Sequence, residues 1–281
     1  MKQVLELYGI STFNEDTDWK RIVAIQRCPF TDRQCIKIRK SQPDVTIGTC
    51  TVSYGRDNIS VMICPNRLLE RKQMFLDCIH LLTLHEPGNE LHIVQEIAIP
   101  GGSVDYFLVS ARDGGVVDFV AIELQTLDTT GTVWPARQKI LHEKDLDTEY
   151  DADDGRSYGM NWKMTAKTIL IQLNHKIHTL ENLNKHLVWV IQDHLLTYMQ
   201  RAFKFDHIRN ARLGDSAHFH VYSLNKQPNN SLRLNLLSRL STNADGIAES
   251  LGLQADPNIE LARLITTLET KISNDTLLQI V

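Results

Sequence analysis

The sequence lacks the features that mark several large classes of protein. No apolar run in its 281 residues approaches the roughly 20 residues that a membrane-spanning helix needs. The start, Met1-Lys2-Gln3-Val4, is not followed by the apolar stretch of a secretory signal, so we expect a cytoplasmic protein with no membrane partner. We find no internal repeat and no low-complexity tract. With 42% hydrophobic and 23% charged residues, the composition excludes collagen-like, disordered and coiled-coil proteins.

The chain also lacks the close Cys-x2-Cys pair that many zinc sites use, although it contains five cysteines. In a reducing compartment thiols stay free or bind metal, because disulfides are rare there. The five cysteines therefore favour a metal site or free thiols over a disulfide framework.

Charge is distributed unevenly along the chain. The formal net charge is −4, yet the segment 20–72 carries eleven Lys or Arg residues against four Asp or Glu residues. A basic segment inside an acidic chain favours local binding of phosphate groups. A solvated basic face is the alternative that charge alone leaves open.

Hydrophobic periodicity predicts a succession of helices and strands after a turn-rich start. Residues 67–84 and 161–184 have the spacing of amphipathic helices, and a shorter helix is expected near 195–203. Strand-like runs occupy Leu91–Ile99, Val104–Val109 and Val116–Gln125, joined by short turns that predict antiparallel pairing. The apolar run 187–191 predicts a buried strand, and another strand is expected near 219–224.

This order of elements predicts an α/β fold with a mixed sheet flanked by helices. We expect a polar loop over 126–160 and a helical tail from about residue 232, whose apolar stripe is Leu261, Leu264, Ile265, Leu268 and Ile272. The predicted division is a turn-rich basic module over 1–66, a core over 67–225 and a helical C-terminal extension over 226–281.

Four cysteines fall within the basic module, at Cys28, Cys35, Cys50 and Cys64. A segment with so few large apolar side chains needs an additional constraint to hold its structure. Four thiolates around one tetrahedral ion can supply it, and such a site suits zinc or iron. Four unrelated thiols are the alternative. The fifth cysteine, Cys78, lies near the apolar stripe of the expected 67–84 helix and is predicted to be a core thiol.

Two acidic residues lie at the ends of neighbouring strand-like runs. Asp105 begins one run after a Gly-Gly turn, and Glu123 with Gln125 ends another. Because side chains alternate along a strand, Glu123 and Gln125 share one face. If the strands pair, Asp105 approaches Glu123, and the two carboxylates form an oxygen site suited to Mg²⁺. Glu96, in the preceding run, is a candidate third acid; the alternative for these acids is exposure to water at a sheet edge.

Several blocks, in this order, resemble the NotI-like type II restriction endonucleases of the PD-(D/E)xK nuclease superfamily. Together they span about 28–192. They are Cys28-Pro29-Phe30 with Cys35 and Lys37, Gly48-Thr49-Cys50, Cys64-Pro65-Asn66-Arg67-Leu68, Val104-Asp105, Glu123-Leu124-Gln125 with Asp128-Thr129-Thr130-Gly131, and Asn161-Trp162 followed by Gln172 and Lys176.

The resemblance implies a nuclease core with an N-terminal four-cysteine metal module, in which Cys28, Cys35, Cys50 and Cys64 hold a structural Fe or Zn ion. It also implies that Asp105 and Glu123 are catalytic ligands of Mg²⁺. Gln125 stands where the superfamily usually has lysine; it cannot act as a base, but it can orient a water or a phosphate oxygen.

The function implied is site-specific hydrolysis of double-stranded DNA by a homodimer, as part of restriction–modification defence. The expected DNA contacts are Arg33, Lys37, Arg39, Lys40 and Arg67. A nonspecific repair or phage-defence nuclease is the first alternative. The second is an inactive four-cysteine DNA-binding regulator, which the glutamine at position 125 would favour.

Overall fold

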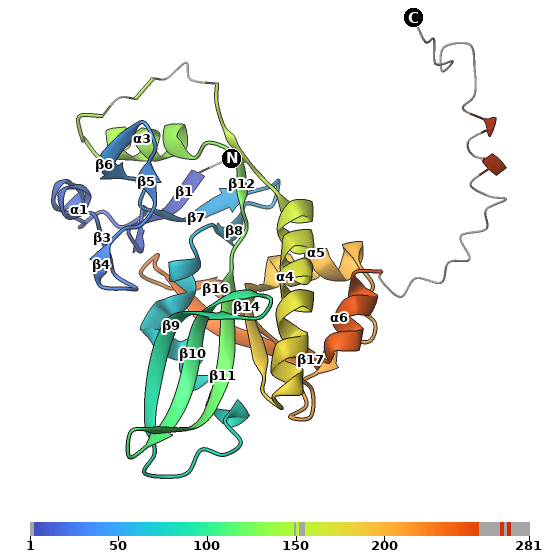
Figure 1. Ribbon diagram of the computed structural model, residues 1–281. Helices are drawn as coiled ribbons and strands as arrows, with labels where there is room; N and C mark the ends of the chain where they lie inside the picture. Colours follow the sequence, from blue (N-terminus) through green and yellow to red (C-terminus); the bar gives the residue numbers. More distant parts are fainter. Residues whose placement is uncertain (1–2, 149, 152–154, 253–264, 267–268, 271–281) are drawn as a thin grey trace, which may run out of the picture.

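A seven-stranded mixed sheet forms the larger part of the molecule. The computed structural model describes residues 3–148, 150–151, 155–252, 265–266 and 269–270 (Figure 1). The strands lie in the order β15-β17-β16-β14-β11-β10-β9. They are β9 (Glu90–Ile99), β10 (Gly102–Arg112), β11 (Gly115–Gln125), β14 (Leu187–Gln192), β15 (Arg209–Asn210), β16 (Ala217–Lys226) and β17 (Leu232–Thr242). The central strands β11, β14 and β16 run parallel, and the outer pairs are antiparallel, so the predicted mixed sheet is confirmed.

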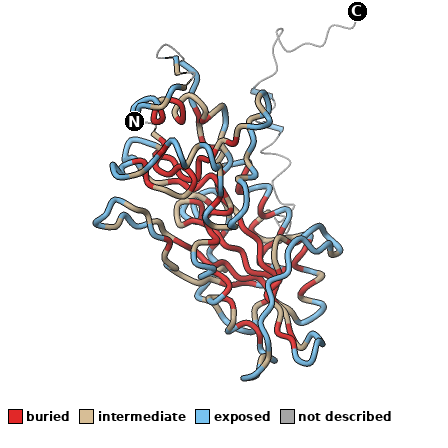
Figure 2. The backbone as a smooth tube through the Cα atoms, turned by 90° about the vertical axis from the view of Figure 1, so that its left-hand side faces the viewer, coloured by how far each residue is buried: buried red, intermediate tan, exposed pale blue. Residues whose placement is uncertain are grey.

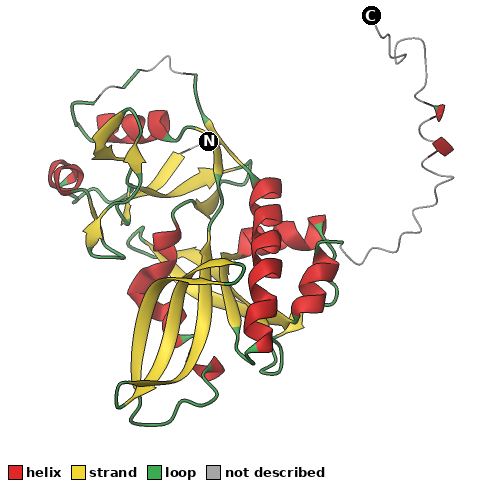
Figure 3. Ribbon diagram, viewed as in Figure 1, coloured by secondary structure: helices red, strands yellow, loops and turns green. Residues whose placement is uncertain are grey.

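Helices pack on both faces of this sheet (Figure 3). One face packs against α4, α5 and α6, and the opposite face packs against the short turns η1, α2 and η2. Their bounds are α4 (Trp162–Asn182), α5 (Asp193–Ala202), α6 (Ala244–Ser250), η1 (Pro65–Lys72), α2 (Gln73–Leu76) and η2 (Ile79–Leu81). The central strand β14 is buried along its whole length, as its apolar run predicts. Figure 2 shows that buried segments gather in the interior of the molecule.

A second, smaller sheet lies at the N-terminal end and has the strand order β2-β1-β7-β8. Its strands are β1 (Gln3–Leu7), β2 (Ile10–Ser11), β7 (Thr49–Tyr54) and β8 (Ile59–Met62). Short elements surround it: α1 (Trp19–Ile25), β3 (Arg27–Cys28), β4 (Arg33–Gln34), β5 (Ile38–Arg39), β6 (Gln42–Thr46), β12 (Thr129–Gly131), α3 (Trp134–Glu143) and β13 (Tyr158–Met160).

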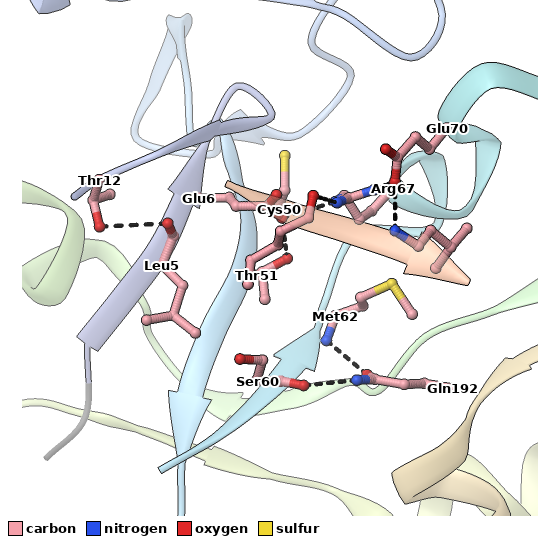
Figure 4. A network of polar contacts seen from close by, with 12 residues as sticks. Leu5, Glu6, Thr12, Cys50, Thr51, Ser60, Met62, Arg67, Glu70 and Gln192 are labelled. Atoms are coloured by element: carbon pink, nitrogen blue, oxygen red, sulfur yellow. Dashed lines mark hydrogen bonds and ion pairs between the residues drawn. The ribbon is translucent and has the colours of Figure 1, made fainter. Parts of the chain in front are cut away.

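One buried amide ties the two sheets together. Gln192, at the end of β14, accepts a hydrogen bond from the Met62 backbone N–H (2.9 Å) and donates to the Ser60 carbonyl (2.6 Å), as Figure 4 shows. Because the amide is 2% exposed, these bonds replace water that the group has lost on folding. The smaller sheet is therefore held at the carboxyl end of the central strand.

Three expectations from the sequence are wrong. Residues 67–84 do not form one helix, because Arg71 (φ 54°) and Lys72 (φ 55°) turn the backbone left-handed between η1 and α2. The 126–160 segment is not all loop, since it contains α3, β12 and β13. Residues 232–242 form strand β17 instead of a helix, because pairing with β16 along the whole strand overrides their local pattern.

The long helix and the strands of the β9–β11 meander agree with their predicted ranges to within a few residues. Of the expected C-terminal stripe, Leu261, Leu264, Leu268 and Ile272 lie outside the described residues. No helix in the described part of the chain is long and apolar enough to cross a membrane.

Two histidines on β16 are buried beneath the η2 turn. The Nε2 atom of His218 lies 2.8 Å from the Asp215 carbonyl, and the ring packs edge-on against His186. His220 stacks on His80, and its Nδ1 atom lies 3.6 Å from the Cys78 thiol, which is fully buried as predicted. Burial lowers the pKa of His218 to about 4, and burial together with the charge of the nearby Arg239 lowers that of His220 to about 3.

We predict that acid destabilises the protein through these two histidines. Their folded pKa values lie below the ordinary 6.5, so the unfolded chain takes up protons first as the pH falls. The free energy of unfolding should be highest above about pH 6.5 and decrease by several kcal/mol toward pH 4. Urea unfolding of wild type and of His218→Asn at several pH values measures this, since asparagine takes up no proton. An unchanged pH slope in the variant would contradict the assignment to His218.

Candidate active site

The register between β10 and β11 places the two candidate acids side by side. Tyr106 pairs with Ile122, so the next position of the same antiparallel register sets Asp105 across from Glu123. Residues directly opposite one another in a sheet point to the same face. Here that is the face covered by α4, because Ala121, two residues before Glu123 on the same strand, packs in the cluster that contains the α4 side chains.

The two carboxylates interact with each other as well as with the backbone. The Oδ2 atom of Asp105 accepts a hydrogen bond from the Leu124 N–H at 2.8 Å. Burial, together with the charge and hydrogen bonding of Asp105, raises the pKa of Glu123 to about 7 against the opposing effect of Lys176. Glu123 is only 8% exposed, so a proton or a cation must balance this concentration of negative charge.

A lysine from α4 reaches the same carboxylate. The Nζ atom of Lys176 lies 2.5 Å from Oε1 of Glu123 and 2.5 Å from the Ser103 carbonyl. Lys176 lies on the buried stripe of α4, between Leu173 and Leu180, where the helical period otherwise places apolar residues. Lys176 is not among the site residues predicted from the sequence, although a lysine inside an apolar stripe is a signal that points to it.

The turn between β9 and β10 makes this approach possible. Gly101 has φ +99°, and a Cβ at that position would lie 2.3 Å from the His175 carbonyl oxygen. Only glycine fits so close to the α4 backbone in this conformation. The hydroxyl of Thr179 also donates to the Pro100 carbonyl at 2.9 Å. The turn therefore rests directly on the helix that carries Lys176.

The two other predicted site residues lie at the edges of this arrangement. Gln125 ends β11 on the same face as Glu123, and its amide donates to the Thr126 carbonyl at 2.8 Å. The register between β9 and β10 places Glu96 across from Asp105, but the residue is exposed and its φ of 53° departs from a strand conformation. In the described chain no three acidic, histidine or cysteine side chains group closely enough to hold a metal ion, so Glu96 is not a third ligand in this structure.

Asp105 and Glu123 still fit Mg²⁺ by their chemistry. Mg²⁺ in phosphoryl-transfer enzymes is bound by one or two carboxylates, and water and substrate phosphate supply its remaining ligands. The raised pKa of Glu123 shows that the two neighbouring carboxylates repel each other, and a bound cation would relieve this repulsion.

The four cysteines of the basic module are only partly gathered. Cys28, Cys50 and Cys64 are buried, Cys35 is half-buried, and none forms a disulfide. The neighbouring Cys50 lowers the pKa of Cys64 to about 6 with help from the charge of Lys37, and the Cys50 thiol donates to the Gly48 carbonyl at 3.6 Å. Burial raises the pKa of Cys35, and the charges of Cys64 and Cys28 add to this effect, so all four lie in one neighbourhood.

The soft thiol donors suit Fe or Zn, but their positions do not make a metal site. Among the residues that the structure describes, no three potential ligands are close enough to share an ion. The predicted four-cysteine site is therefore not confirmed, and what the structure shows is four free thiols in one neighbourhood.

Arg67 is buried, which contradicts its expected contact with DNA. It is 1% exposed, and its guanidinium binds Glu6 at 2.8 Å, Glu70 at 2.7 Å and the Leu232 carbonyl at 2.8 Å. Figure 4 shows Arg67 and Glu6 meeting between β1 and β7, where Thr51 also donates to Glu6. Each of the three guanidinium nitrogens has an acceptor within the protein, and the residue links the smaller sheet to η1 and β17.

The other expected DNA contacts differ in accessibility. Arg33 and Lys40 are exposed, whereas Lys37 donates to the Ile63 carbonyl and Arg39 stacks 4.2 Å above the Trp134 ring. Arg33 lines a cleft of about 390 Å³ between the cysteine module and strands β9 and β10. Further residues of this cleft include Lys72, Tyr106 and Glu96. Basic and aromatic side chains thus border the strand that carries Asp105.

A mixed α/β sheet that presents two adjoining carboxylates and a lysine is an arrangement suited to phosphodiester chemistry. Comparison with protein families identifies the family described as restriction endonuclease NotI, matched over residues 19–231. The chain therefore belongs to the NotI family of restriction endonucleases, which cut DNA. The matched range contains the four cysteines of the module, both acids, Gln125 and Lys176. A search of curated proteins and a search of solved structures each find no match.

We predict that Arg67→Ala destabilises the fold by about 3–5 kcal/mol, because removing the arginine leaves the buried Glu6 without its positive partner. Chemical denaturation measures the loss, and Arg71→Ala, four positions along at an exposed site, should change stability by less than about 0.5 kcal/mol. Equal stability of the two variants would show that the contacts of Arg67 with Glu6, Glu70 and Leu232 do not stabilise the fold.

Proposed function

We propose that this protein is a type II restriction endonuclease that hydrolyses phosphodiester bonds at specific sites in double-stranded DNA with Mg²⁺. The observation that carries the proposal is the contact between Asp105 and Glu123 on neighbouring strands, within a chain of the NotI family. We further propose that the larger sheet with its helices is a PD-(D/E)xK nuclease core.

Each residue of the site has a distinct task in this proposal. Asp105 and Glu123 hold the cation, which when bound supplies positive charge to the scissile phosphate and acidifies a coordinated water. The Leu124 N–H fixes the Asp105 carboxylate, and Lys176 fixes that of Glu123. Gln125 orients the attacking water or a phosphate oxygen by hydrogen bonding. Glu96 is a further acidic residue near the site, at the exposed edge of the sheet, and we assign it no contact with the cation.

We predict that Asp105→Asn and Glu123→Gln each reduce DNA cleavage at least a hundredfold, since either change removes a charged ligand of the proposed Mg²⁺. Phage or plasmid DNA is incubated with each protein and Mg²⁺, with and without EDTA, and the products are separated on a gel. Discrete bands from the wild type support site-specific cleavage.

The matched control for this experiment is Asp113→Asn, an exposed carboxylate in the turn at the far end of the same β10–β11 hairpin. It should cut like the wild type. A smear of products would favour the nonspecific nuclease, and intact DNA with a gel shift would favour the inactive regulator. Full cleavage by either site variant would remove that residue from the mechanism.

DNA binding is assigned to the basic module, with Arg33 and Lys40 as the accessible phosphate contacts and Lys37 and Arg39 as closer, partly engaged ones. We also propose a homodimer, because a palindromic target is read by two copies related by a two-fold axis. An apolar cleft of about 410 Å³ beside the C-terminal end of α4, lined in part by Val116, Phe119 and Leu183, supports self-association there.

For the cysteine module we propose a structural Fe or Zn ion bound by Cys28, Cys35, Cys50 and Cys64. Support comes from three buried free thiols and from the lowered pKa of Cys64, which favours the thiolate that metals bind. The ion would draw together thiols that are now only neighbours, and it would take no part in cleavage.

We predict that Cys50→Ser lowers both the metal content and the melting temperature of the purified protein, since it removes a buried ligand. Elemental analysis for Fe and Zn together with a thermal melt measures both effects. Cys78→Ser, which replaces a buried thiol outside the module, should leave the metal content unchanged. Wild-type protein without Fe or Zn would refute the metal module while leaving the nuclease proposal intact.

A further inference from the structure

The lysine beside Glu123 is the group whose surroundings the proposed function does not fully explain. Its ammonium group sits in a site with two acids, and its side chain is 7% exposed. A buried ammonium is costly unless it is paired and hydrogen-bonded. The Lys176 ammonium donates hydrogen bonds to two acceptors, the Glu123 carboxylate and the Ser103 carbonyl.

A second ion pair on the same strand shows what a purely structural lysine looks like. At the other end of β11, the Lys185 ammonium binds Asp118 at 2.5 Å. The Asp118 carboxylate also accepts from the Leu84 N–H at 2.9 Å and from the Phe119 N–H at 2.8 Å. Three protein donors therefore share the lone pairs of Asp118, so the protein itself saturates that carboxylate.

The Glu123 pair is not saturated in this way. Asp118 has two backbone N–H donors beside its lysine, whereas Glu123 has the Asp105 carboxylate beside its lysine. This second negative charge raises the pKa of Glu123. Lysine carries three N–H donors, and among the described residues two of them have acceptors at Lys176. The pair thus retains oxygen lone pairs for a cation and one ammonium N–H for an anion.

We propose that Lys176 is the cationic residue of the cleavage site, and that its remaining N–H contacts a phosphate oxygen of the bound DNA. The proposal rests on the proposed endonuclease function. The strand position that could have carried a charged group has the neutral Gln125, and the positive charge comes instead from helix α4, held in place by the Gly101 turn.

The chemistry gives this charge a direct use. During hydrolysis the water oxygen bonds to phosphorus as the bond to the leaving ester oxygen breaks, the water releases a proton to solvent, and the leaving oxygen takes one up. Negative charge increases on the non-bridging phosphate oxygens between these events. A fixed ammonium in a site with little water stabilises that charge more strongly than the charge of the unreacted diester.

The test compares Lys176→Met with Lys185→Met, two changes that each remove a lysine from an ion pair on β11. Both should lower the melting temperature. Only Lys176→Met should reduce kcat for DNA cleavage at saturating Mg²⁺, by about a hundredfold or more, the loss typical for one removed donor to a developing charge. Lys185→Met should stay within about threefold of the wild type.

A second measurement separates a direct role from a loss of structure. DNA binding in Ca²⁺, measured by gel shift or fluorescence anisotropy, should remain within about threefold in Lys176→Met, because Asp105 and Glu123 are still present. Lys176→Arg, which keeps the charge, should recover at least tenfold of the lost kcat. If Lys176→Met does not fold, Lys176→Gln replaces it, since glutamine can still donate to Glu123 without a charge.

Cleavage by the folded neutral variant at a rate equal to that of Lys185→Met would overturn the assignment, as would a charged variant no faster than the neutral one. The failure of the proposed function is distinct from this result. In that case the wild type itself would not cut, or Asp105→Asn and Glu123→Gln would cut normally.

Discussion

The register of one antiparallel hairpin is the constraint on which the candidate site depends. Asp105 and Glu123 approach each other because Tyr106 pairs with Ile122, and a slip of one residue would send one of the two carboxylates to the opposite face of the sheet. The hairpin is held from both sides: β11 pairs in parallel with the buried strand β14, and β10 pairs with β9. The apolar residues that alternate with the acids therefore determine where the charge lies.

Buried charge also connects the parts of the molecule. Arg67 joins the smaller sheet to the end of η1 and to β17, and Lys176 joins α4 to the β10–β11 hairpin. Each is paired with carboxylates, as burial of an ionised group requires, but the pairs differ in their surroundings. Each nitrogen of the Arg67 guanidinium has an acceptor within the protein, whereas the Lys176 ammonium binds a carboxylate that adjoins a second carboxylate. The first pattern is that of a structural link and the second that of a site that interacts with a ligand.

The basic module borders the larger sheet near strands β9 and β10. Arg33 of the module, Glu96 of β9 and Tyr106 of β10 line one cleft. Burial raises the pKa of Tyr106, and the charge of Asp105 adds to this effect while that of Arg33 opposes it. This cleft lies on the side of the sheet that η1 and α2 cover, whereas Asp105 and Glu123 point to the side that α4 covers.

Patterns within single segments determined much of the architecture. Alternation and short turns identified the β9–β11 meander, the 3.6-residue period identified α4, and the position of the two acids at strand ends indicated where they would meet. Contacts between distant segments decided the rest. Leu232–Thr242 is a strand because β16 offers it an edge, Arg67 is buried because Glu6 lies 61 positions away in sequence but adjacent in space, and Lys176 reaches Glu123 across 53 positions. Local sequence carries propensity and periodicity, whereas the partner of a buried charge or of a strand edge exists only once the chain has folded.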